Sequence, residues 1–598
     1  MCGIVGYVGY GIAQDFVFDA LKRLEYRGYD SVGVAYLDDD GLHRMRALGG
    51  VSNLEQQAQK TVNCASTMIG HTRWATHGRV SIANAHPQMD AEHKIAVVHN
   101  GIIENFEELR RKLLEQNVVF ESTTDTEVIP NLISAGIKNV KNTPNNILWC
   151  ICDVLKALKG SFALCILVQG CNKIFATARF SPLILAKLSD GYVVASDIMG
   201  LGKADEVYTI PNDTLLMIDK NSFVCYDMQL NEVMLKKLSK TSVQYDDDMH
   251  PYSSFMEKEI NEGTKAINDT VRELLVKRQL EIDDKIVRQV GRVVICACGT
   301  ALHAGRIFGC LLEELCGITA IIDYASEYRY RNAPIDKQTI CIFISQSGET
   351  ADTLSCVEFA RSKGAYCIGV SNVPTSRLVS LVDYVVPTYA GVERAVASTK
   401  AYMAQLGALY LLGNKFCEVL GRQTLYDWKD IVHTTDLIKT QQTDDFLSQI
   451  VPQLTDLEHL YILGRGIDYV SAMEGALKIK EISYIHCEAM PLGELKHGSL
   501  ALFGNNTYAI VLMTQNNVAD KVVSNIHEIR SRGAKVILLT TLDVKVEVEH
   551  CLHLDCSIDV LSPFVVTPVL QQLALRLATA RKLDVDKPRN LAKSVTVE

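Results

Sequence analysis

The chain has 598 residues, of which 48% are hydrophobic and 22% are charged, and its net charge is −10. This composition is typical of globular proteins, and at about 150 residues per domain the length predicts three or four domains. Acidic and basic residues are interspersed without a basic run, so nucleic acid is not an expected partner. We find neither a targeting segment nor an apolar stretch long enough to span a bilayer, so we expect a cytoplasmic protein outside membranes.

Cysteine and histidine are both frequent, with 18 and 15 residues. The cysteines are dispersed, many lie in apolar runs such as 293–298, and no CxxC pair occurs. They are therefore predicted to be mainly buried, reduced side chains in a reducing compartment. Five of the 15 histidines fall between His71 and His99, but their spacing fits no zinc template and we expect no metal site.

The first 235 residues alternate short β-rich runs with turns and a few helices, which predicts an α+β domain over residues 2–235. Strands are expected at 3–8, 95–99, 163–168 and 192–195. Residues 236–250 are polar and include three consecutive aspartates, which indicates an interdomain linker. A helical stretch is expected over 254–287, so that linker and leading helix together occupy residues 236–285.

From residue 286 onward an apolar strand, a polar loop and a helix recur along the chain. Strands are expected at 293–298, 320–324, 339–344, 366–370 and 384–387. A helical connector over 401–439 follows, and then further strands at 459–463, 508–513, 535–540 and 553–555. This alternation predicts two tandem α/β domains with doubly wound parallel sheets, over residues 286–425 and 445–598.

Cys2 is a candidate nucleophile. Once Met1 is removed, the thiol and the α-amine stand on one residue, and an amine with a pKa of about 7.7 to 8.0 accepts the thiol proton near neutral pH. For an isolated cysteine the alternative, a small apolar residue at the start of an edge strand, would be preferred. The neighbouring motifs favour catalysis.

Those motifs lie at 2–6, 25–31, 71–78, 84–87, 99–101 and 124–127. As an ordered set they resemble the glutamine amidotransferase domain of the N-terminal nucleophile hydrolase class. The resemblance implies a four-layer αββα fold over residues 2–235 and glutamine as a substrate. It makes Asn100 and the Gly101 N–H the oxyanion hole for attack by Cys2.

The same resemblance implies a glutamine-binding pocket in which Arg73 clamps the carboxylate and Asp125 takes the ammonium. Trp74 would gate an ammonia passage, and the remaining pocket residues would be Thr76, His77 and His86. Taken singly, these residues would be assigned ordinary structural roles, namely a surface ion pair for Arg73, a helix N-cap for Asp125 and a tight turn for Asn100 and Gly101.

A second site is indicated at residues 345–353, directly after the expected strand 339–344. Its hydroxyls and backbone amides suit a phosphate, although a capped helix start is the alternative. With 298–300, 325–331 and 396–400 it resembles sugar isomerase (SIS) domains. The resemblance implies that the sugar phosphate is bound by Thr300, Ser345, Gln346, Ser347, Thr350, Val396, Ser398 and Ala592.

Glu474, Lys478 and Glu481 are spaced to share one face of a helix, where an exposed ion-pair ladder is the default interpretation. A carboxylate beside two sugar carbons would instead move a proton between them. By resemblance, Glu481 moves that proton, Lys478 sets the charge near the open-chain sugar, His497 opens the ring, and Lys593 in the C-terminal tail closes over the substrate.

As a whole the chain resembles the amidotransferases that convert fructose 6-phosphate and glutamine to glucosamine 6-phosphate and glutamate, the first step of hexosamine synthesis. The resemblance implies internal ammonia transfer, no cofactor, and at least a homodimer in which His497 reaches a neighbouring subunit. Two alternatives are an amidotransferase with another phosphorylated acceptor and a non-catalytic sugar-phosphate regulator. The chain departs from the family pattern at Ala301, Arg394, Ala395 and Ser499, which concerns sugar affinity and loop geometry.

Overall fold

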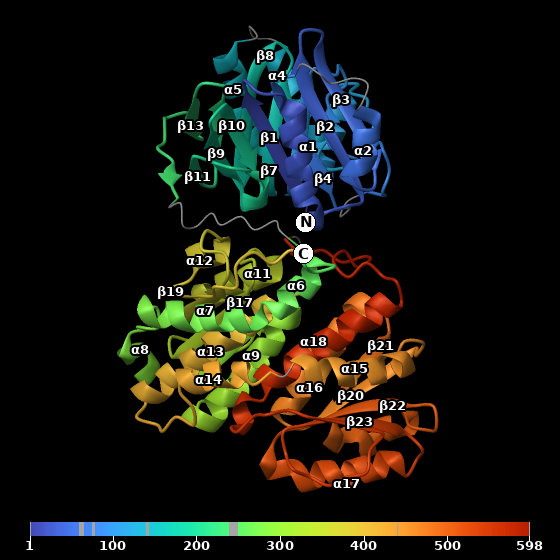
Figure 1. Ribbon diagram of the computed structural model, residues 1–598. Helices are drawn as coiled ribbons and strands as arrows, with labels where there is room; N and C mark the ends of the chain where they lie inside the picture. Colours follow the sequence, from blue (N-terminus) through green and yellow to red (C-terminus); the bar gives the residue numbers. More distant parts are fainter. Residues whose placement is uncertain are drawn as a thin grey trace. The chain divides into compact units, whose positions relative to one another are not determined.

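The computed structural model describes residues 2–58, 65–74, 78–138, 143–238, 249–438 and 440–596. The chain divides into two compact units. The first contains Met1–Tyr245 together with the C-terminal tail Ala592–Glu598, and the second contains Asp246–Leu591. Figure 1 labels many of the elements of both, and each unit is described by itself.

The first unit contains two antiparallel sheets. The larger has the order β14-β11-β9-β10-β1-β4-β2-β3 and the smaller β13-β12-β8-β7-β6-β5. The strands of the larger sheet are β1 (Gly3–Gly9), β2 (Ser31–Asp38), β3 (Gly41–Leu48), β4 (Thr67–Arg73), β9 (Ile184–Leu188), β10 (Gly191–Ala195), β11 (Glu206–Thr209) and β14 (Lys236–Lys237). Those of the smaller sheet are β5 (Gln88–Met89), β6 (Ile95–Ile103), β7 (Gly160–Val168), β8 (Cys171–Arg179), β12 (Thr214–Ile218) and β13 (Phe223–Asp227).

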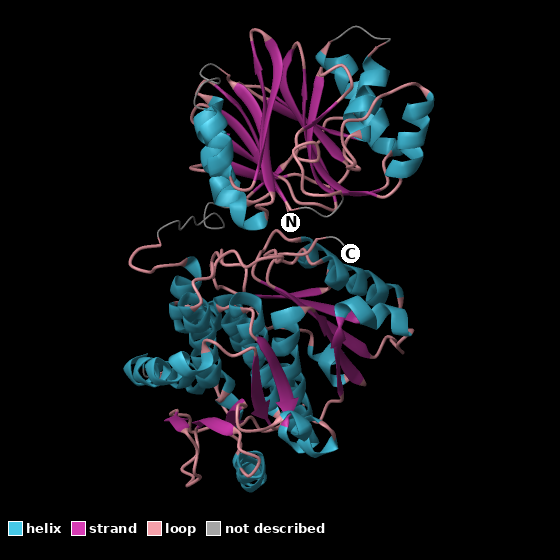
Figure 2. Cartoon of the chain, turned by 90° about the vertical axis from the view of Figure 1, so that its right-hand side faces the viewer, coloured by secondary structure: helices cyan, strands magenta, loops and turns pink. Residues whose placement is uncertain are grey.

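Helices cover the outer face of each sheet in this unit (Figure 2). Helices α1 (Ala13–Leu24) and α2 (Val51–Ala58) pack on the larger sheet, and α4 (Val128–Ile137) packs on the smaller sheet beside α3 (Phe106–Glu115) and α5 (Pro144–Ala157). One apolar core, which includes Ile4 and Val98, lies between the two sheets. This is the predicted αββα arrangement, and it explains why strands such as β1 are apolar on both faces.

The second unit contains two five-stranded parallel sheets with the same strand order. The first is β16-β15-β17-β18-β19 and the second β21-β20-β22-β23-β24. Their strands are β15 (Arg292–Ala297), β16 (Ala320–Tyr324), β17 (Thr339–Ser345), β18 (Tyr366–Ser371), β19 (Tyr384–Pro387), β20 (His459–Gly464), β21 (His486–Pro491), β22 (Tyr508–Met513), β23 (Lys535–Thr540) and β24 (His550–His553). The predicted pair of doubly wound α/β lobes is therefore confirmed.

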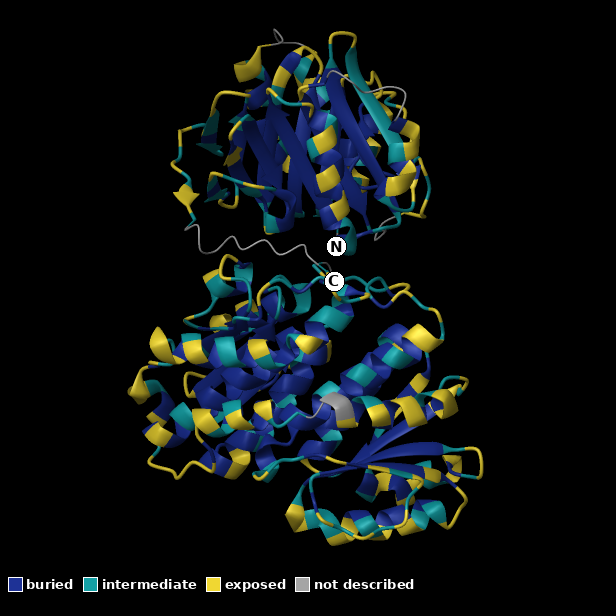
Figure 3. Ribbon diagram, in the orientation of Figure 1, coloured by how far each residue is buried: buried dark blue, intermediate teal, exposed yellow. Residues whose placement is uncertain are grey.

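Helices surround these sheets and connect the two lobes within the second unit. They include α6 (Phe255–Asn261), α7 (Gly263–Val276), α8 (Asp284–Arg288), α9 (Gly299–Leu311), α11 (Ala351–Ser362), α13 (Lys400–Val419), α14 (Trp428–Asp436), α15 (Thr440–Leu454), α16 (Ile467–Ser483), α17 (Ala519–Arg530) and α18 (Pro563–Ala580). Helix α9 of the first lobe packs against α16 of the second. Figure 3 shows the strands as mostly buried and the outer helices as alternately buried and exposed.

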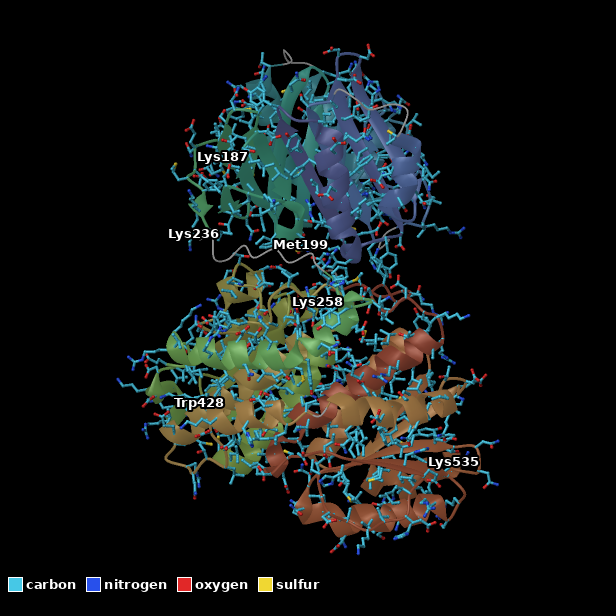
Figure 4. The ribbon with its side chains drawn as sticks, viewed as in Figure 1. Lys187, Met199, Lys236, Lys258, Trp428 and Lys535 are labelled. Carbon is cyan, nitrogen blue, oxygen red and sulfur yellow. The ribbon has the colours of Figure 1, made fainter. Side chains whose placement is uncertain are left out.

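Two predictions about the second sheet were wrong at its edges. No strand was expected at 486–491, where β21 lies, and the strand expected at 553–555 is β24 at His550–His553. Both are edge strands with exposed polar residues, so the apolar run that identifies a central strand is absent. The inner strands β22 and β23 were predicted correctly, and Lys535, labelled in Figure 4, joins them by a hydrogen bond to the Tyr508 hydroxyl (3.0 Å).

A second correction concerns the expectation that no apolar stretch of the chain is long enough to span a bilayer. Within the described chain, one helical stretch, Asp559–Ala580, has the length and mean hydropathy (1.3) of a membrane span, although no such stretch was expected from the sequence. Of its most apolar window, 83% is buried inside the protein. Its residues, among them Phe564, Val566 and Leu570, belong to the apolar cores of the second unit, which accounts for the composition of this helix.

Candidate functional site

Cys2 stands at the start of β1, where several groups fix its position. The Trp74 N–H donates to the Cys2 sulfur (3.3 Å). The Cys2 carbonyl accepts hydrogen bonds from Asn100 Nδ2 (2.9 Å) and Arg27 Nε (3.2 Å). Because an N–H donor stabilises a thiolate, and because the backbone is held from two sides, the geometry suits a positioned sulfur nucleophile.

A pocket opens beside Cys2 within the first unit. It contains seven of the nine residues predicted for the glutamine reaction, together with four from the C-terminal tail, among them Ala592, which was predicted for the sugar phosphate. The lining residues are Cys2, Arg73, Trp74, His86, His99, Asn100, Gly101, Thr124, Asp125, Thr126, Ala592, Ser594, Val595 and Thr596. Thr76 and His77, also predicted for this site, lie outside the described residues.

Arg73 and Asp125 place opposite charges in this pocket, and both are buried. Burial lowers the pKa of Arg73, while Cys2, Asp30 and Asp125 favour its charged form. The Asp125 carboxylate accepts the Ile103 N–H (2.8 Å), and helix α4 begins only at Val128. The two structural alternatives, a surface ion pair for Arg73 and a helix N-cap for Asp125, are therefore wrong. A guanidinium and a carboxylate in one pocket suit an amino acid zwitterion.

Gly101 has a backbone conformation that requires glycine. Its φ is +126°, and a Cβ there would lie 2.0 Å from the Ser161 carbonyl oxygen. Asn100 and Gly101 pair with Ala163 and Phe162 in the β6–β7 ladder, so the tight-turn alternative is wrong. The peptide at the mouth of the pocket is consequently held by a strand, in keeping with a preorganised oxyanion donor.

The second candidate site begins at the carboxyl end of β17. The Ser345 hydroxyl accepts the Gly348 N–H (3.0 Å) and bonds to the Thr350 hydroxyl (2.9 Å), and the Ser347 hydroxyl accepts the Glu349 N–H (3.2 Å). Gly348 has a φ of +66°, and a Cβ there would lie 2.1 Å from Ser376 Oγ. Gln346 follows Ser345 in the same loop. A closed loop of hydroxyls and amides before α11 suits a phosphate.

Other residues predicted for the sugar phosphate are engaged with neighbours in the second unit. Thr300 stands at the start of α9, and its hydroxyl donates to Glu474 (3.2 Å). The Ser398 hydroxyl donates to Glu393 (3.1 Å), and the Val396 N–H donates to the Asp586 carbonyl (3.1 Å). Since β15 and β17 are parallel neighbours, Thr300, which comes after β15, and Ser345, which ends β17, lie at the same sheet edge.

Lys478 is 1% exposed and lies between two carboxylates. Its Nζ is 2.6 Å from Glu481 Oε2 and 3.6 Å from Glu474 Oε1. Burial lowers the pKa of Lys478, but Glu481 and Glu474 raise it more, so the net shift is upward and the side chain is an ammonium. The exposed ladder was therefore the wrong alternative.

His303 was not predicted from the sequence, yet its Nδ1 lies 2.7 Å from Glu474 Oε2 and both side chains are buried. His303 is on α9 and Glu474 is on α16, so the contact joins the two lobes. A single turn of helix separates His303 from Thr300, which is the only sequence signal that could have identified it.

The hydrogen bonds described above for Lys478, Glu474 and Glu481 do not include His497 or Lys593. His497 is exposed and ends a short helix at Leu492–His497. Lys593 and Ala592 belong to the tail that is grouped with the first unit. Their roles at the sugar site stay predictions.

Comparison with known proteins identifies the family. Residues 71–203 match the glutamine amidotransferase domain, and residues 286–415 and 453–581 match the SIS domain. Over 619 residues the chain is 40% identical to glutamine–fructose-6-phosphate aminotransferase (isomerizing) from Clostridium perfringens, with all of both proteins covered. The chain belongs to this family.

Two further comparisons agree with the family assignment. The Bradyrhizobium diazoefficiens family member is 37% identical over 617 residues, again with full coverage. A solved structure, the C-terminal domain of glucosamine-fructose-6-phosphate aminotransferase from Francisella tularensis, matches with a TM-score of 0.54 and 35% identity. It covers 57% of this chain and all of that one.

The geometry of Gly101 gives a first testable prediction. Gly101→Ala should lower the rate of glutamine hydrolysis by about 100-fold or more, because the added Cβ displaces the peptide at the oxyanion position. Gly136→Ala in α4 is a matched control, since its Cβ would meet Cys150 atoms only at 3.4 Å. Glutamate release from glutamine measures both. Full activity of Gly101→Ala would contradict the role of this peptide.

A second prediction concerns Lys478. Lys478→Met should destabilise the second unit by about 3–5 kcal/mol, because it leaves Glu474 and Glu481 without their counter-ion. Lys480→Met makes the same change at an exposed position two residues away and should leave stability nearly unchanged. Calorimetric unfolding of the full chain compares them. Equal melting temperatures for the two variants would show that the buried charges are compensated elsewhere.

Proposed function

We propose that the protein transfers the amide nitrogen of glutamine to fructose 6-phosphate and releases glutamate and glucosamine 6-phosphate. The observation that carries this proposal is the presence, in one chain, of the Cys2 pocket with its Arg73 and Asp125 charges and of an SIS pair in which the buried Lys478 contacts Glu481. The first suits glutamine, and the second suits proton transfer on a sugar.

In the glutamine reaction, the Cys2 sulfur attacks the side-chain amide carbon after the α-amine accepts the thiol proton. The negative charge that develops on the amide oxygen is stabilised by Asn100 Nδ2 and the Gly101 N–H. Collapse of this intermediate breaks the C–N bond, and the amine returns its proton to the departing nitrogen as ammonia. Water then hydrolyses the thioester to glutamate and restores the thiol.

In the sugar reaction, His497 promotes opening of the ring and ammonia adds to the C2 carbonyl with loss of water. The resulting C2 imine becomes an aldose amine when one proton leaves C1 and one is delivered to C2, while the O1 hydroxyl loses its proton as the C1 carbonyl forms and the nitrogen gains one. Glu481 performs both transfers as a carboxylate base and then as an acid. The Lys478 ammonium, 2.6 Å from Glu481, pairs with the Glu481 carboxylate before the first transfer and after the second, when that group is ionised.

We also propose at least a homodimer in the cytoplasm. His497 is exposed in the single chain, which fits a residue that completes the site of a neighbouring subunit. The described cysteines form no disulfide, in keeping with a reducing compartment.

The coupled reaction is tested by incubating the purified protein with glutamine and fructose 6-phosphate and measuring glutamate and glucosamine 6-phosphate together. We expect equal yields from the wild type. Cys2→Ala should lose both products from glutamine, while Glu481→Gln should still release glutamate and lose the amino sugar. Glutamate alone from the wild type would indicate another phosphorylated acceptor. Sugar-phosphate binding with neither product would favour a regulator.

The shared site is tested by co-expressing His497→Ala and Glu481→Gln, each inactive alone. If His497 acts in the neighbouring subunit, a mixed dimer has one intact site, so random pairing restores about a quarter of wild-type synthesis. If both residues act within one subunit, every site keeps a defect and the mixture stays inactive. Singly expressed variants, mixed after purification without subunit exchange, provide the control.

A further inference from the structure

Three histidines form a buried cluster beside the Cys2 pocket. His71 lies on β4, His99 lies on β6, and His86 precedes β5. The ring centroids of His71 and His86 are 4.3 Å apart, and those of His86 and His99 are 6.4 Å apart. These three histidines thus converge on the glutamine site, although of the three only His86 was predicted to belong there.

His71 and His86 are neutral in this cluster. Burial, assisted by the nearby Arg73 charge, lowers the pKa of His71 to about 3 and that of His86 well below its ordinary range. A neutral imidazole carries a single N–H, so the contacts of its ring nitrogens decide which one bears the proton.

The contacts of His71 place its proton on Nε2. This nitrogen lies 2.9 Å from the His99 carbonyl oxygen and 3.1 Å from Asn100 Oδ1. Both oxygens only accept hydrogen bonds, so Nε2 must be the donor. His86 Nδ1, 3.3 Å from the same nitrogen, then has no proton of its own and faces His71 as an acceptor.

The second contact of the Asn100 amide supports the assignment of His71 Nε2 as the donor. Asn100 Nδ2 lies 2.9 Å from the Cys2 carbonyl oxygen, which also only accepts. The amide therefore presents its NH₂ group to Cys2 and its oxygen to His71. A rotated amide would set two oxygens against each other at Cys2 and two donors against each other at His71.

We infer that His71 is a positioning residue for the glutamine reaction, whose Nε2–H holds the Asn100 amide in the orientation that presents its NH₂ group at Cys2. This role rests on the proposed glutamine chemistry, in which Asn100 Nδ2 stabilises the oxyanion. His71 is not among the residues that line the pocket, and it acts through Asn100.

The test compares His71→Leu, which removes the donor, with His71→Gln, whose Nε2 occupies a similar place along the side chain. We expect His71→Leu to lower kcat for glutamine hydrolysis by about 100-fold, the effect of losing one oxyanion donor, with less than about a threefold change in KM. His71→Gln should recover most of the activity. His93→Leu, at an exposed histidine, is the control and should match the wild type.

Two additional measurements separate positioning from a structural effect. Alkylation of Cys2 by iodoacetamide requires the thiol but no oxyanion hole, so its rate should be the same in His71→Leu and wild type. In an Asn100→Ala background, His71→Leu should cost almost nothing further, because the residue through which it acts is gone. The pH profile of hydrolysis by His71→Gln should keep its acid limb in place, since His71 does not titrate there.

Several outcomes would overturn the inference. Three concern hydrolysis by the single variants: an unchanged kcat in His71→Leu, a change in His71→Leu that is confined to KM, or equal losses of activity in His71→Leu and His71→Gln. The other two are a slower alkylation of Cys2 in His71→Leu and a loss of activity that is additive with that of Asn100→Ala. A shifted acid limb in His71→Gln would make His71 a proton carrier instead. Absence of glutamine hydrolysis by the wild type would defeat the proposed function itself, and is thereby distinguishable from failure of the His71 assignment.

Discussion

Burying the Lys478 ammonium in the second unit is tolerable only because two carboxylates face it. An isolated buried charge costs several kcal/mol even after relaxation, and attraction to a partner offsets this cost only with close geometry and further hydrogen bonds. Glu481 supplies the close contact, and Glu474 supplies the second carboxylate. Glu474 is in turn bonded by Thr300 and His303 on α9. The contacts that neutralise Lys478 therefore also join α9 of one lobe to α16 of the other.

The first unit also buries polar groups beside its site, and those of the His71–Asn100 series are neutral. Around Cys2 the buried donors and acceptors form a directed series in which His71 donates to Asn100 and Asn100 donates to the Cys2 carbonyl. Such a series fixes orientation through neutral groups, although the charged Arg27 also donates to the Cys2 carbonyl (3.2 Å). Arg73 and Asp125 carry the formal charges among the described residues that line the pocket. In the proposed glutamine reaction, the full charges would then bind the ionic groups of the substrate, and the neutral dipoles would stabilise the charge that develops during reaction.

The sequence predicted the inner parallel strands closely because they are continuous apolar runs bounded by polar loops. The expected strand 339–344 is β17 at Thr339–Ser345, and 508–513 is β22 at Tyr508–Met513. It could not predict β21, whose exposed His486 and Glu488 mask the strand pattern, or the division of 254–287 into three helices. Motif order identified the pocket residues, since Arg73, Asn100 and Asp125 do meet Cys2 there. His71 and His303 acquire their roles from partners on other elements, which spacing along the chain does not reveal.

The departures from the family pattern at Arg394 and Ala395 show how a site loop tolerates substitution. The loop that contains Ser398 is held by the buried Glu393 carboxylate, which accepts N–H groups from Thr399 (2.8 Å) and Ala401 (2.9 Å). The Arg394 guanidinium lies over the Phe255 ring (4.0 Å) on α6, at the start of the second unit. Because the loop depends on Glu393, and because Arg394 packs against a neighbouring helix, a large cation at position 394 is accommodated while Ser398 stays bonded to Glu393.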